Sequence, residues 1–234
     1  MTAAGLRKPE PRAEAPRPRR LLDLGGLRLV RPVLDLAGMR LVRLHLASRR
    51  VPGALAALAL CGLVLRAALY WHWSLGSGNA AQELAVVLEA GAASVIAVTA
   101  QSPFGDPERA TGRWLPYLRL GTAVGLTAAA VGALCVGAAA EQLPGGTLDI
   151  LRNTAGMSGI GLLLAAVIGG ALAWVGPMAY MVVTLFALSG GWTTPWLWPA
   201  RPSHDLGGAL CAGLVFAAGL VVATVRGSRA PREI

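Results

Sequence analysis

Residues 51–72 read VPGALAALALCGLVLRAALYWH, an apolar run interrupted by a single charge at Arg66. About 20 consecutive apolar residues are enough to cross the hydrocarbon core of a bilayer as a helix, so this run predicts a transmembrane span. Comparable runs recur along the chain. The sequence therefore predicts an all-α, polytopic integral membrane helix bundle of about six spans, at 51–72, 80–100, 115–140, 156–173, 177–190 and 206–225.

The fourth and fifth spans come from one stretch, 156–190, which is apolar throughout. We divide it at Trp174-Val175-Gly176-Pro177 because it is too long for a single crossing. A re-entrant hairpin, which would leave five crossings, stays open as an alternative, since the turn between the two short spans carries no basic residue.

The composition agrees with a lipid environment. Of the 234 residues, 55% are hydrophobic and 14% are charged, and the mean hydropathy is +0.57. Soluble globular domains carry about 25% charged residues, so an ordinary soluble domain is excluded. Three cysteines lie inside apolar runs and are expected to be small buried hydrophobic residues: Cys61, Cys135 and Cys211.

The positive charge of the chain is concentrated before the first span. The first 50 residues hold 12 of the 21 basic side chains and 4 of the 12 acidic ones. This asymmetry predicts a cytoplasmic N-terminal segment beside anionic lipids rather than a nucleic-acid-binding surface. We expect four segments: a disordered basic and Pro-rich segment at 1–38, an amphipathic interfacial helix at 39–50, the six-span domain at 51–225 and a cytoplasmic tail at 226–234.

Two starts of translation stay open, because Met39 begins the predicted interfacial helix. Residues 22–31 and 34–43 are a local duplication, LDLGGLRLVR and LDLAGMRLVR, too short to indicate a repeat fold.

Basic residues predict that both termini are cytoplasmic. The loop between the second and third spans and the C-terminal tail are arginine-rich, whereas the predicted outer loops hold Arg152 and Arg201. All seven tryptophans fall at predicted span ends, where aromatic rings prefer the headgroup layer: Trp71, Trp73, Trp114, Trp174, Trp192, Trp196 and Trp198. On this orientation Arg109 faces the cytoplasm, and Asn79 and Glu141 face outward.

Small residues recur every four positions in three of the predicted spans. This spacing is typical of helices whose backbones approach closely in a membrane. We expect most of these residues to pack within the chain, with packing across a dimer as the alternative: Gly121, Gly125, Ala129, Ala133 and Gly137; Ala155 and Gly159; and Ala209, Gly213 and Ala217.

Three charged residues lie inside the first two spans: Arg66, Glu83 and Glu89. Charges at membrane depth usually face a partner or a wet cavity. Helical rise places Arg66 at a depth between the two carboxylates, so we expect it to form an ion pair with one of them. Two roles stay open, a structural ion pair and the polar lining of a translocation path.

The loop after the second span reads SPFGDPER from Ser102 to Arg109. Asp106 as N-cap, Pro107 in the first turn and Glu108 beside the helix N-terminus predict a short cytoplasmic helix that runs toward Arg113. An ordinary capped loop and a docking element for a cytoplasmic partner both fit.

A catalytic alternative rests on Gly156-Met157-Ser158-Gly159, which fits the GxSG of rhomboid-type intramembrane proteases, with His204 as the base. The match is short, and His204 is expected in a shallow loop, so we assign no catalytic residue. The chain has no GxxxxGK[ST], HExxH or CxxC motif, and we expect no nucleotide site, cofactor or metal in this chain.

Taken in order, these features resemble ABC-2-type transporter permeases of high-GC Gram-positive bacteria. The resemblance covers about 39–230 and is carried by the basic segment ending LASRR, SPFGDPER followed by Arg113-Trp114-Leu115-Pro116, LRNTAGMSG before the fourth span, and Trp174 to Tyr180 at the next turn. The spans 156–173 and 177–190 are shorter than the family pattern, and Trp192 to Pro199 is the candidate for its half-inserted outer segment.

The resemblance implies the membrane subunit of an ABC exporter, with ATP hydrolysis in a separate cytoplasmic ATPase and a second permease subunit completing a homo- or heterodimer. The same likeness implies that the loop after the second span docks on the ATPase through Phe104, Asp106, Glu108, Arg109 and Arg113. A non-transporting subunit of a membrane complex remains a second hypothesis. The substrate stays open among lipids, hydrophobic natural products and peptides.

Overall fold

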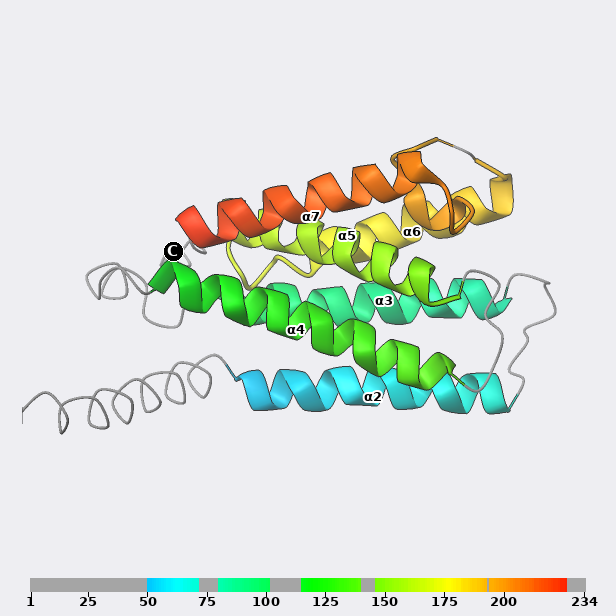
Figure 1. Ribbon diagram of the computed structural model, residues 1–234, viewed down its shortest axis with the longest axis horizontal. Helices are drawn as coiled ribbons and strands as arrows, with labels where there is room; N and C mark the ends of the chain where they lie inside the picture. The colour runs from blue at the N-terminus through cyan, green and yellow to red at the C-terminus, as the bar shows by residue number, and fades with distance from the viewer. Residues whose placement is uncertain (1–49, 72–79, 102–114, 140–145, 193, 227–234) are drawn as a thin grey trace, which may run out of the picture. The chain divides into compact units, whose positions relative to one another are not determined.

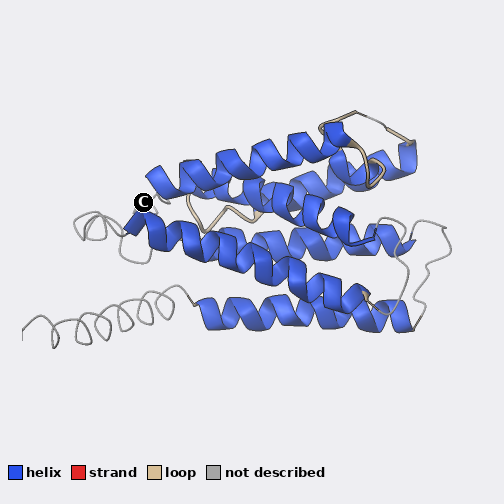
Figure 2. Cartoon of the chain, in the orientation of Figure 1, coloured by secondary structure: helices blue, strands red, loops and turns tan. Residues whose placement is uncertain are grey.

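The computed structural model describes residues 50–71, 80–101, 115–139, 146–192 and 194–226. Within these ranges every regular element is helical and no strand occurs (Figure 2). The elements are α2 (Val51–Tyr70), α3 (Ala80–Thr99), α4 (Leu115–Ala138), α5 (Gly146–Val167), α6 (Val175–Gly190), the 3₁₀ turn η2 (Trp198–Ala200) and α7 (Leu206–Arg226).

Five of the described helices, α2, α3, α4, α5 and α7, are long and apolar enough to cross a membrane. The all-α fold is therefore confirmed for the described residues, and the length and composition of these helices are consistent with a multi-pass membrane protein. The remaining helix, α6, has 16 residues, which span about 24 Å at the helical rise of 1.5 Å per residue. It ends at Gly191, whose φ of 65° suits a residue without a side chain, with the Trp192 N–H bonded to the Ala187 carbonyl.

The helix α5 lies at the centre of the bundle. It packs most extensively against α7 and α3 and also contacts α4 and α6, whereas α2 packs along α4 and α3 (Figure 1). Consecutive helices alternate in direction, so α3, α5 and α7 begin at the end of the bundle where α2, α4 and α6 finish. We call this the cap end, because residues 194–205 close it, and we call the opposite end the pocket end.

The predicted boundaries of the fourth span were wrong. The helix α5 begins at Gly146, ten residues before the predicted start at 156, and ends at Val167 instead of 173. Its first turns contain Asp149 and Arg152, which interrupt the apolar run but form an ion pair of 2.8 Å on one face. The helical structure is interrupted at 168–174, between α5 and α6, slightly before the predicted division at 174–177. The other helix ends fall within about two residues of the predicted ones.

Two of the predicted packing glycines mark the closest helix contacts. A Cβ at Gly137 of α4 would collide with the backbone carbonyl of Gly62 in α2. A Cβ at Gly159 of α5 would lie 2.6 Å from the Val215 carbonyl oxygen of α7, and Gly219 meets Gly159 from the other side. For these two positions, packing within the chain is confirmed.

Gly121, Gly125 and Gly213 do not pack against the described part of the chain, because an added Cβ would meet nothing within 4 Å, and packing across a dimer stays open for them. These three residues are exposed, as are Ala209 and Ala217, whereas Ala129 is partly buried against the α2–α3–α4 core. The physical reason is the helical period: a spacing of four residues advances about 40° more than a full turn. A stripe that starts at Gly121 has therefore wound onto a different face by Gly137.

Several predictions lie outside the described residues. They concern the segment 1–38, the interfacial helix 39–50 apart from Arg50, the docking residues Phe104, Asp106, Glu108, Arg109 and Arg113, and the tail beyond Arg226.

Candidate functional site

The connection between α6 and α7 folds back into the cap end of the bundle. Within it Leu197 is fully buried and Trp198 is 2% exposed. The Trp198 ring packs on the ring of Tyr180 in α6, with 4.6 Å between the ring centroids. It also covers Gly156 of α5, where an added Cβ would lie 2.6 Å from ring atom Cζ2. The Trp198 ring thus packs inside the bundle, where it fills the space left open by a glycine, and its depth in a membrane stays a prediction.

Two side chains from the helices hold the backbone of this connection. The Tyr180 hydroxyl donates to the Trp196 carbonyl at 2.6 Å, and Gln82 Nε2 of α3 donates to the Pro199 carbonyl at 3.3 Å. Residues 194–205 are thus fastened to α3 and α6, and we call them the cap.

Arg152 joins the cap to α5. Its guanidinium donates to the carbonyls of Pro202 at 2.8 Å and Arg201 at 3.0 Å and pairs with Asp149 at 2.8 Å. The residue is 7% exposed. The prediction that Arg152 lies in an outer loop was wrong. A buried guanidinium is stable when its charge is paired and its N–H groups are bonded, and Arg152 meets both conditions.

Asp205 completes the cap at the start of α7. It accepts from the Gly208 N–H at 2.6 Å, as a helix N-cap does, and from Arg201 at 2.7 Å. The Arg201 side chain and the Gly208 N–H hold the pKa of Asp205 below its ordinary value. This carboxylate is therefore ionised over the whole physiological range.

The central acidic residue of the site is Glu89. It is 2% exposed and lies between α3 and α5, where the Asn153 side chain hydrogen-bonds to its carboxyl group. Asn153 Oδ1 accepts from Arg152 Nε at 3.3 Å, which leaves the Asn153 amide N–H groups to face Glu89. The second carboxyl oxygen, Oε2, is buried without a hydrogen-bond partner among the described residues.

Among the described residues no ion pair joins Arg66 with Glu83 or Glu89, so the predicted pair was wrong. Arg66 is exposed on α2, Glu83 is half-buried near the start of α3, and Glu89 faces α5. Depth along the membrane normal was consistent with a pair, but depth does not fix the direction in which each helix turns its side chains.

The catalytic alternative gains no support from the geometry. Ser158 is fully buried, and its Oγ has no hydrogen-bond partner among the described residues. His204 is exposed in the cap. The hydrogen bond between nucleophile and base that such a protease uses is therefore not formed in the described part of the chain.

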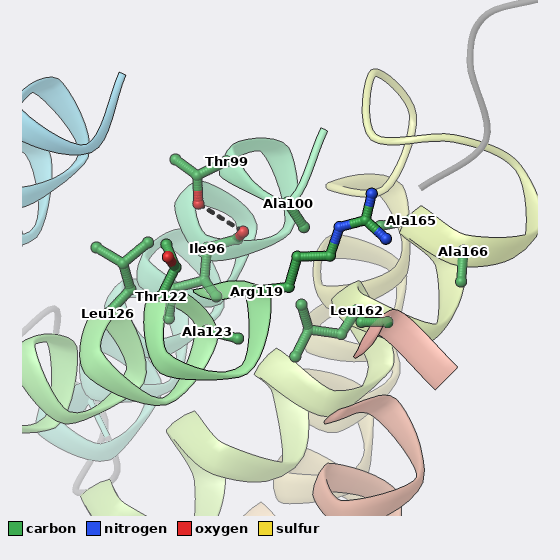
Figure 3. Close-up of a pocket in the computed structure, with 11 residues that line it drawn as sticks. Ile96, Thr99, Ala100, Arg119, Thr122, Ala123, Leu126, Leu162, Ala165 and Ala166 are labelled. Carbon is green, nitrogen blue, oxygen red and sulfur yellow. Dashed lines mark hydrogen bonds between the residues drawn. The ribbon is translucent and has the colours of Figure 1, made fainter. Parts of the chain in front are cut away.

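At the pocket end, a small pocket opens between α3, α4, α5 and α7, and Figure 3 shows the residues around it. Its wall is mostly apolar, and Arg119 of α4 is the charged residue in it. Thr99 and Thr122 also line it, but their hydroxyls donate to the carbonyls of Ile96 and Leu118, each at 2.7 Å. Arg119 lies in the first turns of α4, within the predicted third span.

The sequence analysis missed Asp149, Asn153 and the buried role of Trp198. One sequence feature could have predicted these polar contacts: Asp149 and Arg152 are three residues apart, and Asn153 follows directly. The helix places i and i+3 on one face, so such a pair can be carried into an apolar bundle. Comparison with protein-family models, with curated proteins and with solved structures finds no match for this chain, and the resemblance to ABC-2-type permeases stays a prediction.

Proposed function

We propose that this chain is the membrane subunit of an ABC exporter, which forms the translocation path and receives its energy from a separate cytoplasmic ATPase. The observation that carries the proposal is the cap. A short helix, α6, is followed by a segment whose residues Leu197 to Pro199 are buried in the bundle before α7 begins. A half-inserted segment at this place is what the resemblance implies.

In this proposal the chain crosses the plasma membrane six times with both termini in the cytoplasm. The cap then lies on the outer side, and the pocket with Arg119 lies toward the cytoplasm. The distribution of arginines supports this orientation, because Arg119 and Arg226 fall at the pocket end. Arg152, which the sequence put in an outer loop, is compensated by Asp149 and does not weigh against it.

A second permease subunit would pack on the free face of α7. This face exposes Ala209, Gly213 and Ala217 at four-residue spacing, the pattern that allows close helix approach in lipid. The opposite face of α7 is occupied by Gly159 of α5. The proposal therefore assigns one face of α7 to the chain itself and the other to the partner.

The test is a change in the proposed docking loop. Phe104→Ala combined with Arg109→Glu removes an apolar anchor and reverses a charge, and interface energy is concentrated in a few such residues. We expect normal membrane insertion and detergent stability, together with loss of co-purification with the ATPase or of coupling between ATP hydrolysis and export.

A matched control is Ser102→Ala in the same loop, which should bind the ATPase as the wild type does. If the doubly substituted protein still bound and stimulated its ATPase normally, the loop would be a plain connector. The docking role of Phe104 and Arg109 would then be contradicted, and the exporter assignment would have to rest on the hydropathy of the chain alone.

A further inference from the structure

Glu89 carries a carboxyl group deep inside an apolar bundle. It lies nine residues after the start of α3, about 14 Å along the helix. It is 2% exposed, so neither water nor lipid headgroups reach it in this conformation. Asn153 bonds one side of the carboxyl group, and Oε2 has no hydrogen-bond partner among the described residues.

The charged and titratable groups around Glu89 do not supply a cation for it. On α5, Arg152 faces it together with Asp149, but these two form an ion pair at 2.8 Å, and the other Arg152 N–H groups bond to cap carbonyls. On α4 the neighbouring titratable group is Cys135. On α2, Arg66 is exposed and forms no ion pair with Glu89.

An ionised Glu89 would therefore be an uncompensated charge in a medium of low polarity. Such a charge is strongly unfavourable, and a carboxyl group in this position takes up a proton instead. The neutral acid also fits the local hydrogen bonding, because a protonated carboxyl still accepts from Asn153 through one oxygen.

Three more polar atoms near this part of α5 lack partners among the described residues. Thr154 Oγ1 and Ser158 Oγ are fully buried on α5, and Trp198 Nε1 is buried where its ring covers Gly156. Buried polar groups are normally hydrogen-bonded to protein or to ordered water, so these atoms are sites at which water would bind once it enters this region.

We propose that Glu89 is a proton-binding site, which holds one proton while α3 and α5 are packed together and releases it to water when the seam between them opens. The step breaks the O–H bond of the carboxylic acid and forms one hydronium ion and one carboxylate. No other bond changes. Opening of the bundle is thereby linked to the release of one proton per chain.

The first measurement is the infrared spectrum of the folded full-length protein at neutral pH. We expect a carbonyl stretch of a protonated carboxylic acid in the wild type and its loss in Glu89→Gln. Glu83→Gln is the matched control, because Glu83 lies on the same helix but is half-buried. A wild-type spectrum without this band would overturn the proposal, and this result does not require the variant to fold.

The second measurement is the pH dependence of reversible unfolding in mixed micelles. Unfolding exposes Glu89 to water, where it ionises. Relative to Glu89→Gln, the unfolding constant of the wild type should therefore rise with pH above the ordinary pKa of glutamate, by up to about tenfold per pH unit. A ratio that does not change with pH would mean that Glu89 has the same charge in both states, which contradicts the proposal.

Neither measurement uses an ATPase or a transported substrate. Failure of the exporter assignment would therefore leave these results standing, and their failure would leave the exporter assignment untouched. A positive result would mean that any conformational change that separates α3 from α5 is accompanied by release of a proton from Glu89.

Discussion

The two ends of the bundle accommodate arginine in different ways. At the cap end Arg152 is buried, and its guanidinium is bonded to Asp149 and to two cap carbonyls. At the pocket end Arg119 is partly exposed beside an apolar pocket, where Thr99 and Thr122 turn their hydroxyl donors to their own helices. At the cap end the guanidinium thus fastens a buried segment to α5, whereas at the pocket end the arginine lines a small pocket. We infer that the cap end of the bundle is more rigid than the pocket end.

The largest expected difference concerns the two arginines. Arg152→Met leaves the partly buried Asp149 carboxylate unpaired and releases the cap, so we expect a loss of about 3–5 kcal/mol in unfolding free energy. Arg119→Met, the matched change at the pocket end, should cost less than Arg152→Met, because Arg119 is partly exposed and its guanidinium is partly hydrated. Unfolding of both purified variants in mixed micelles measures the difference. Equal losses would show that the two ends are held alike.

Two glycine substitutions should change stability in opposite directions. Gly156→Ala places a methyl group against the buried Trp198 ring, and we expect a loss of about 1–3 kcal/mol. Gly125→Ala on α4 meets open space, so it should gain about 0.5–1 kcal/mol from lower backbone entropy in the unfolded chain. Thermal melts in one detergent compare the two. A gain in both variants would mean that the cap is not packed onto α5.

The smallest expected effect is a pH dependence at the cap. Because the pKa of Asp205 is lowered in the folded protein, its contribution to stability is present above the ordinary carboxyl pKa and is lost as the pH falls through the folded value. The melting temperature of the wild type should therefore fall more than that of Asp205→Asn between about pH 7 and pH 3. Asparagine still caps the helix, so it isolates the charge. If the melting temperatures of the two proteins fell equally with pH, the charge of Asp205 and its pairing with Arg201 would not stabilise the cap.

Much of the fold followed from local features of the sequence. The positions of α2, α3, α4 and α7 were predicted to within about two residues, because each apolar run ends at polar or helix-breaking residues. The start of α5 was missed because Asp149 and Arg152 make its first turns look like a loop. Each charge alone would be unfavourable in an apolar helix, but the ion pair between Asp149 and Arg152 compensates both charges.

The site was less predictable than the fold. The sequence identified Glu89 as an intramembrane charge but paired it with Arg66, because the argument used only depth. Its actual neighbour, Asn153, comes from a helix more than sixty residues later in the chain. Contacts of this kind depend on how α3 and α5 are rotated about their axes, and neither apolar run contains that information.

By itself, the sequence determined that this chain forms apolar helices of membrane length, because the length of an apolar run and its breaks are local properties matched to the thickness of a bilayer. The tertiary structure decided which glycines meet a neighbouring backbone, that Trp198 fills the space above Gly156, and that Arg152 is buried in the cap. Each of these depends on which face a helix turns to its neighbour. Successive residues are about 100° apart around a helix, so a small rotation exchanges one buried residue for another without changing the hydropathy of the span.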